Sequence, residues 1–194
     1  VSVSCGRYHS CAVLEDQCVK CWGYNEFGGL GLGDGEHRGD GAGEMGEELP
    51  CVDVGVGRGV RSVSAGQYHS CVVLDDMSIK CWGQNGRGQL GVGDTVNRGG
   101  GGEDMGGNLT RVDVGEGRRG VSVSAGYMHT CAVLGGGGVK CWGDNSHGQL
   151  GVGDVLGRGD GEYGMGDALP FVDVGGGGRV LSVSCGERHT CAVV

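Results

Sequence analysis

The sequence predicts an all-β protein built from one repeated unit of four short strands, and three observations support this prediction. A period of 60 residues runs through the chain without insertion or deletion, and it is marked most simply by His9, His69, His129 and His189. Short runs rich in β-branched residues alternate with glycine-rich turns. No window shows a sustained apolar period of about 3.6 residues, so we expect no helix beyond a turn or two.

The strands can be placed within one copy of the repeat. In the second copy they are expected at 63–65, 69–74, 79–82 and 112–115. An Asp-Asp turn separates the second strand from the third, and a long glycine-rich stretch precedes the fourth. Four short strands at this spacing are typical of a β-propeller blade. A solenoid is the competing repeat architecture, but its repeats are usually shorter or helical.

The period also sets the domain organisation. It divides the chain into three complete repeats and the start of a fourth, at 1–60, 61–120, 121–180 and 181–194. Three and a quarter blades cannot close a ring, so we expect a part of a larger propeller, with an open array of repeats as the alternative. Residues 1–5 do not resemble a signal peptide, which suggests a mature or internal segment of a longer chain.

The longest motif of the repeat resembles a known family. Residues 121–134 read Val-Ser-Val-Ser-Ala-Gly-Tyr-Met-His-Thr-Cys-Ala-Val-Leu, and 139–154 read Val-Lys-Cys-Trp-Gly-Asp-Asn-Ser-His-Gly-Gln-Leu-Gly-Val-Gly-Asp. This pattern is similar to the regulator of chromosome condensation repeat. It recurs clearly at 61–94, whereas the first copy has Gly29 in place of Gln89. The resemblance covers the whole chain and implies a β-propeller, in that family typically of seven blades.

The cysteines predict disulfides within the blades. Two periodic cysteines lie ten residues apart on either side of a hairpin turn, in the pairs Cys11 and Cys21, Cys71 and Cys81, and Cys131 and Cys141. Directly opposed Cα atoms in an antiparallel pair are about 4.5–5.5 Å apart, which suits a disulfide. Cys191 has no equivalent partner in the chain, and the pairing of Cys5, Cys18, Cys51 and Cys185 cannot be read from the spacing.

This cysteine density indicates an oxidising compartment, so we expect a secreted, disulfide-rich variant of the repeat. Free buried thiols in a cytosolic protein are the first alternative. Zinc is the second, because His9 and Cys11 share a strand face and Cys21 lies opposite. Zinc requires four ligands at defined spacing, however, and this set offers three, so we expect no metal and no cofactor.

The acidic loop at 33–41 has two interpretations. Asp34 and Asp40 lie among glycines, as calcium ligands often do, but the second copy has Gly100 in place of the second aspartate. The simpler interpretation is an aspartate that caps a turn and pairs with the nearby Arg38.

The repeated histidines and tryptophans are expected to be structural. An active site needs one constellation rather than four copies, so His9, His69, His129 and His189 are predicted to fix loops by hydrogen bonds. The tryptophans are predicted to pack within or between blades, with a glycan-binding or peptide-binding groove as the alternative. They are Trp22, Trp82 and Trp142. Asn108 begins an Asn-Leu-Thr sequon and is a candidate for glycosylation.

Charge and hydropathy exclude some partners. The chain carries a net charge of −9 without basic runs, which argues against nucleic acid, and it has no apolar stretch near the roughly 20 residues of a membrane span. The expected partners are other proteins, including copies of itself or a filament partner, and a glycan is the further alternative.

No catalytic motif is present, so we expect a non-enzymatic protein. The leading hypothesis is an extracellular or cell-surface interaction and structural module, for example a component of a filament, a wall or a flagellar appendage. Its long loops at 24–49, 84–109 and 144–169 are predicted to form one surface. The alternatives are an intracellular propeller, either a scaffold or resembling the family's nucleotide exchange factor for the small GTPase Ran, and a secreted inhibitor or lectin-like binder.

Overall fold

The computed structural model describes residues 1–161, 164–175 and 178–194 and is an all-β structure of four antiparallel sheets. The first three sheets are three-stranded and the last has two strands. In chain order they consist of β1 (Ser2–Cys5), β2 (His9–Val13) and β3 (Val19–Gly23); β4 (Val60–Ala65), β5 (His69–Leu74) and β6 (Ile79–Gly83); β7 (Gly120–Ala125), β8 (His129–Leu134) and β9 (Val139–Gly143); and β10 (Ser182–Cys185) and β11 (Thr190–Val193). Helix in the described part is limited to two 3-10 turns, η1 (Gly106–Asn108) and η2 (Gly166–Ala168). No described helix is long and apolar enough to cross a membrane.

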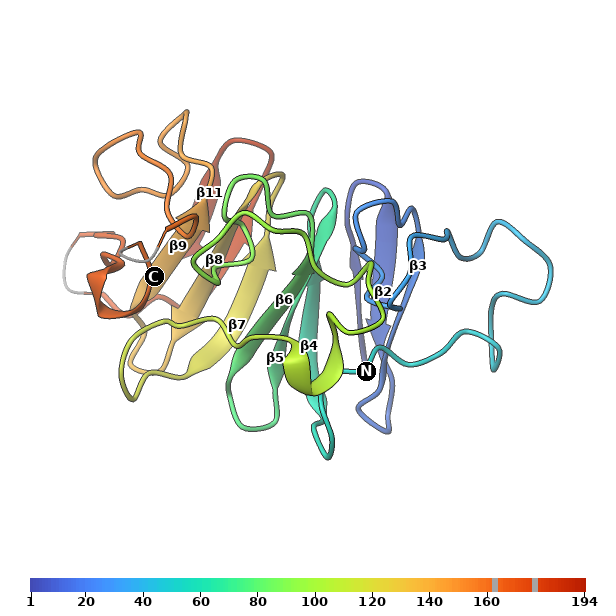
Figure 1. Ribbon diagram of the computed structural model, residues 1–194. Helices are drawn as coiled ribbons and strands as arrows, with labels where there is room; N and C mark the ends of the chain where they lie inside the picture. Colours follow the sequence, from blue (N-terminus) through green and yellow to red (C-terminus); the bar gives the residue numbers. More distant parts are fainter. Residues whose placement is uncertain (162–163, 176–177) are drawn as a thin grey trace.

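The sheets stand beside one another as successive blades (Figure 1). Their first strands, β1, β4, β7 and β10, are neighbours and form the inner edge of the arc. A serine on each of β1, β4 and β7 accepts a hydrogen bond from a backbone N–H of the next inner strand, as Ser4 does from Ala65 at 3.0 Å. The turns that follow these strands surround one cavity of about 280 Å³. All four blades therefore face a common axis, as in a propeller.

The fourth strand predicted for each blade is reduced to an edge segment. In the second blade it makes one bridge, between Lys80 and Arg111, whose hydrogen bond runs from Val112 N to Ile79 O at 2.9 Å. The carboxylate of Asp113 then accepts the N–H of Gly115, which turns the chain away before a ladder forms. The prediction of four strands was therefore wrong in this detail: three strands and a partly paired edge make the blade.

The hydrophobic core lies between blades as well as within them. Trp82 packs with Val72 and Leu74 of its own blade against Cys11 and Val13 of the preceding one. The strand β5 is buried along its whole length, whereas β2 alternates between buried and half-buried residues. The difference arises because the second blade has a described neighbour on both faces and the first on only one.

Four disulfides cross-link the structure. The cysteines that lie ten apart are directly opposite in register and 4.1 Å apart at Cα, and they form Cys11–Cys21, Cys71–Cys81 and Cys131–Cys141. The fourth disulfide, Cys18–Cys51, could not be read from the sequence. It joins the hairpin turn of the first blade to the edge segment, and no other blade repeats it.

Three cysteines are free: Cys5, Cys185 and Cys191. Cys5 and Cys191 are exposed, while burial raises the pKa of the Cys185 thiol to about 11. This thiol is therefore protonated at neutral pH.

The hairpin turns explain one of the glycine tracts. The residue at the third turn position has a positive φ in every complete blade: 67° at Gln17, 66° at Met77 and 89° at Gly137. This region favours glycine, so the tract at 135–138 places one where the turn requires it. Another tract, 175–178, falls partly on residues 176–177, which lie outside the described residues.

Candidate interaction surface

The repeated histidines form one hydrogen-bond network at each blade boundary. At the first boundary His9 Nε2 lies 2.8 Å from Ser70 Oγ, and this hydroxyl donates to the carbonyl of Gly29 at 2.8 Å. The indole N–H of Trp82 donates to the same carbonyl at 2.9 Å. Because the hydroxyl hydrogen is used on Gly29, the imidazole is the donor to Ser70, which defines its Nε2–H tautomer.

The network recurs at the next two boundaries. His69 bonds Thr130 at 3.0 Å, and Thr130 and Trp142 both donate to the carbonyl of Gln89. His129 bonds Thr190 at 3.0 Å in the same way. His189 is exposed and has no equivalent bond among the described residues.

Burial makes these histidines poor acid–base catalysts. Desolvation lowers the pKa of His69 to about 3 and the pKa values of His9 and His129 to about 4. All three are neutral near pH 7, so they connect the blades and do not exchange protons at that pH. Trp82 and Trp142 are fully buried in the same network, while Trp22 on the outer face of the first blade is partly exposed. Neither buried tryptophan lines an open groove.

The acidic loop is held by local ion pairs. Asp34 lies 2.6 Å from Arg38, and the Asn25 side chain donates to the Asp34 carbonyl and carboxylate. The second and third blades repeat this arrangement with Asp94–Arg98 and Asp154–Arg158, each at 2.7 Å. In the described part of the chain these aspartates belong to no cluster with metal-binding geometry.

The predicted loop surface is only partly formed. The first part of each long loop, such as 24–38, lies at the blade end that carries His9, because Gly23 pairs with both His9 and Arg38. The rest of the loop runs along the outer edge, where Lys20 Nζ donates to Gly46 O at 2.7 Å. The Asn108 side chain is exposed in η1 and donates to the Glu103 carbonyl.

Among the residues that the structure describes, aromatic side chains gather at this blade end at the first boundary only. We call them the aromatic surface: Tyr8, Tyr24, Phe27, His37 and Tyr68. Tyr68 is at the centre, stacked on Tyr8 with ring centroids 5.1 Å apart. It contacts Phe27 edge-on at 4.9 Å and Tyr24 at 5.3 Å. Tyr24 also lies 5.0 Å from the ring of His37.

Charged groups border the aromatic surface. The guanidinium of Arg7 lies 5.3 Å from the ring centres of both Tyr8 and Tyr127. The Tyr24 hydroxyl donates to Glu26 at 2.6 Å, and this bond raises the pKa of Tyr24 to about 12. Tyr8 remains 45% exposed, so the stacked rings are accessible to a partner.

The equivalent positions in the other blades carry different chemistry. The position of Tyr8 and Tyr68 is occupied by Met128 and then Arg188. Phe27 is replaced by Arg87 and then His147, and at the third boundary Arg188 lies 3.2 Å from His147. The blade interior is therefore constant while this surface varies. Sequence reasoning did not single out the tyrosines. The available signal was that Tyr8 and Tyr68 each directly precede the repeated histidine of their blade.

Two models of the same repeat family match this chain. A family model for the Regulator of chromosome condensation (RCC1) repeat matches residues 18–73 and 137–193, and a second model of the same repeat matches 1–28, 60–89 and 121–149. The chain is 31% identical over its full length to the human probable E3 ubiquitin-protein ligase HERC4, and covers 16% of that protein. It is 33% identical over 157 residues to the ultraviolet-B receptor UVR8 of Arabidopsis thaliana; the match covers 79% of this chain and 31% of the receptor.

Two solved structures are similar in fold. Prp20p from Saccharomyces cerevisiae matches with a TM-score of 0.70 and 20% identity, over 98% of this chain and 42% of that one. The ectodomain of the receptor kinase CR4 from Physcomitrella patens matches with a TM-score of 0.55 and 16% identity, over 100% of this chain and 38% of that one. The chain thus spans less than half the length of each of these relatives.

Proposed function

Because the chain belongs to the regulator of chromosome condensation (RCC1) repeat family, we propose that it is a non-catalytic propeller segment that binds another protein through its aromatic surface. The observation that carries this proposal is the exposed cluster around Tyr68, bordered by Arg7. Tyrosine and arginine are enriched among the residues that dominate binding energy at protein interfaces. In the described part of the chain the other blades have the same scaffold without the cluster, so folding alone does not require it.

The relatives support a role in protein interaction. Prp20p has binding properties toward Gsp1p and histones. The ligase activity named for HERC4 is not part of the proposal, since the match covers only 16% of that protein.

For the location, we propose the cell exterior or cell surface, in an assembly such as a filament, a wall or a flagellar appendage. Four disulfides in one chain favour an oxidising compartment. The CR4 ectodomain is an extracellular protein with this fold. An intracellular scaffold or exchange-factor-like propeller is the alternative, and a secreted inhibitor or lectin-like binder is the other.

Thiol labelling of the native protein tests the location. Cells are lysed directly into denaturant that contains an alkylating reagent, so that buried thiols react as well, and the remaining disulfides are then reduced and labelled with a second reagent. We expect Cys71 and Cys81 to carry only the second label. First label on both would favour the intracellular alternative.

Site-specific photo-crosslinking tests the binding surface. A photoreactive phenylalanine analogue replaces Tyr68 in one variant and Met128, the equivalent residue of the third blade, in the matched control. We expect one partner protein to be cross-linked from position 68, and its yield to fall at least about tenfold when Tyr8→Ala and Phe27→Ala are added. Equal cross-linking from both positions would contradict the proposal.

A further inference from the structure

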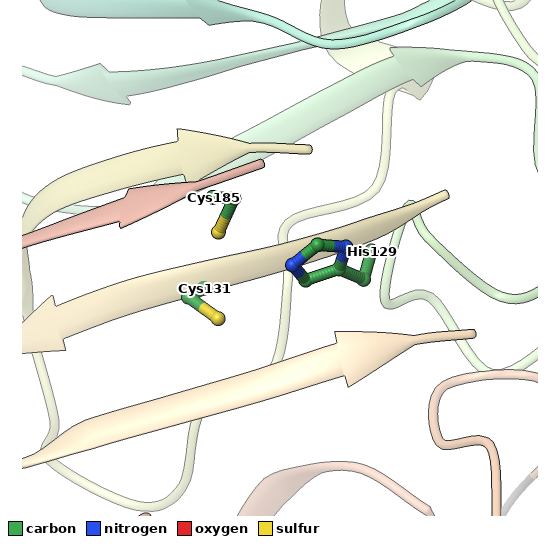
Figure 2. A group of neighbouring side chains, drawn as sticks. All are labelled: His129, Cys131 and Cys185. Atoms are coloured by element: carbon green, nitrogen blue, oxygen red, sulfur yellow. The ribbon is translucent and has the colours of Figure 1, made fainter. Parts of the chain in front are cut away.

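One side-chain cluster outside the aromatic surface joins two blades. A ring nitrogen of His129 and the sulfur atoms of Cys131 and Cys185 all lie within 4.8 Å of one another. His129 and Cys131 are on β8, whereas Cys185 is on β10 of the next blade (Figure 2). This cluster is the one group with metal-binding geometry in the described residues.

A fourth ligand lies beside this group. Cys141 is opposite Cys131 in the register of β8 and β9 and forms a disulfide with it. In the disulfide neither sulfur is a thiolate, so the oxidised protein offers only His129 and Cys185. Reduction frees the sulfur atoms of Cys131 and Cys141, so three thiols and one imidazole lie at this boundary. Cys141 Sγ is bonded to Cys131 Sγ in the disulfide, but it is not among the atoms that lie within 4.8 Å of one another. Tetrahedral zinc with bonds of about 2.3 Å places its sulfur ligands about 3.8 Å apart, so the Cys141 side chain has to turn toward His129 and Cys185 once the disulfide is reduced.

We propose that the reduced form binds one zinc ion through His129, Cys131, Cys141 and Cys185. A dithiol reductant supplies two electrons to the Cys131–Cys141 disulfide and is itself oxidised to a disulfide. Zinc then replaces the protons of the three thiols, and the neutral imidazole supplies the fourth ligand through Nε2. This nitrogen gives up its hydrogen bond to Thr190, and its proton moves to Nδ1. Cys131 and Cys141 can thus either form the disulfide or bind the metal, but not both at once.

The other blade boundaries show what is special about this one. Each has the same histidine and the same cysteine pair, for example His69 with Cys71 and Cys81. The position of Cys185, however, is occupied by Ala65 at the first boundary and Ala125 at the second. A free thiol beside the repeated histidine and disulfide occurs only at the third boundary of the described chain.

The surroundings allow a metal to enter. Cys185 is partly exposed and lines the cavity of about 280 Å³ on the common axis. The consequence of binding is structural: the disulfide joins strands of one blade, whereas the zinc ion would join β8 and β9 to β10 of the next. The inference does not rest on the proposed function, because it concerns a different part of the molecule.

Cobalt titration of the full-length protein tests this site. The protein is reduced with a phosphine under an inert atmosphere, and Co²⁺ is added because its thiolate complexes have characteristic visible and charge-transfer bands. We expect one equivalent of Co²⁺ to bind with these bands and to be displaced by Zn²⁺. Cys185→Ala, which installs the residue of the other boundaries, should weaken binding at least about 100-fold. The oxidised protein should show no thiolate bands.

A gain-of-site variant separates this site from metal capture by unfolded thiols. Ala125→Cys places a thiol beside His69, Cys71 and Cys81 and should raise the stoichiometry from one to two. The matched control is Val56→Cys, which adds a thiol at a fully exposed position and should leave it at one. Absence of thiolate bands in the reduced protein, unchanged binding by Cys185→Ala, or an equal increase in both added-cysteine variants would overturn the proposal.

Discussion

The interior of the blade boundaries and the rims of the same blades differ in how far the repeat holds. In the interior the same bonds recur, from His9 to Ser70 at one boundary and from His69 to Thr130 at the next. At the rims each blade is different: aromatic rings at the first boundary give way to the pair of Arg188 and His147 at the third. Interior positions must satisfy buried polar groups, while rim positions are free to vary and therefore to acquire a function.

The outer edges show the same freedom. The edge segment is held to the hairpin turn by the Cys18–Cys51 disulfide in the first blade. In the second blade an ion pair between Arg111 and Asp76, 2.9 Å apart, does this. Equivalent positions on the outer edges of two blades can thus carry different residues, because water can hydrogen-bond the polar groups that are exposed there.

The largest expected effect is in the interior. Trp82→Ala should destabilise the protein by about 3–5 kcal/mol, because it leaves a cavity between two blades and removes the bond to Gly29. Trp22→Ala, at the partly exposed equivalent position, should cost less than half as much. Urea denaturation of both variants measures the difference. Equal losses would show that packing against a neighbouring blade does not set the cost of the substitution.

The stability of the folded protein should also depend on pH, because His69 is buried in the same interior network. Its pKa is about 3 in the folded protein and about 6.5 in the unfolded chain, so protonation favours the unfolded state. Stability should be full above pH 6.5 and decline as the pH falls, by roughly 3 kcal/mol at pH 4 for this residue. His69→Asn should lower stability at pH 7 but flatten the decline, which denaturation across this pH range would detect. An unchanged slope in the variant would show that other groups cause it.

On the outer edges, the disulfide of the first blade and the ion pair of the second should differ in how much they stabilise the folded protein. Replacing Cys18 and Cys51 together with alanine should cost about 2–4 kcal/mol, because the disulfide restricts a loop in the unfolded chain. Arg111→Ala removes an exposed ion pair and should cost less than about 1 kcal/mol. Thermal unfolding of the two variants provides the comparison. A cost for Arg111→Ala as large as that of the double cysteine variant would contradict it.

The smallest effect concerns the hairpin turns and is a gain. Met77→Gly should stabilise the second blade by up to about 1 kcal/mol, since φ is 66° there and the third blade already has glycine at this position. Met77→Ala is the control and should give no comparable gain. Thermal unfolding of both variants distinguishes relief of strain from loss of the methionine side chain.

Much of the fold could be predicted from the sequence because the decisive signals are local. A hairpin centred on residue 16 places Cys11 opposite Cys21 whatever surrounds it, and the period repeats that hairpin every 60 residues. The fourth strand was predicted incorrectly, because the pattern at 112–115 shows extended backbone but not whether a full ladder forms.

The sequence by itself thus determined the class of fold and the family. The tertiary structure alone decided which residues of different blades meet. Tyr68 joins Tyr8 across 60 residues, Cys185 joins Cys131 across 54, and Cys18 finds Cys51 on the edge segment. The physical reason is that hairpin geometry depends on neighbours along the chain, whereas contacts between blades depend on how one blade is rotated and packed against the next. A periodic sequence carries no direct record of that rotation.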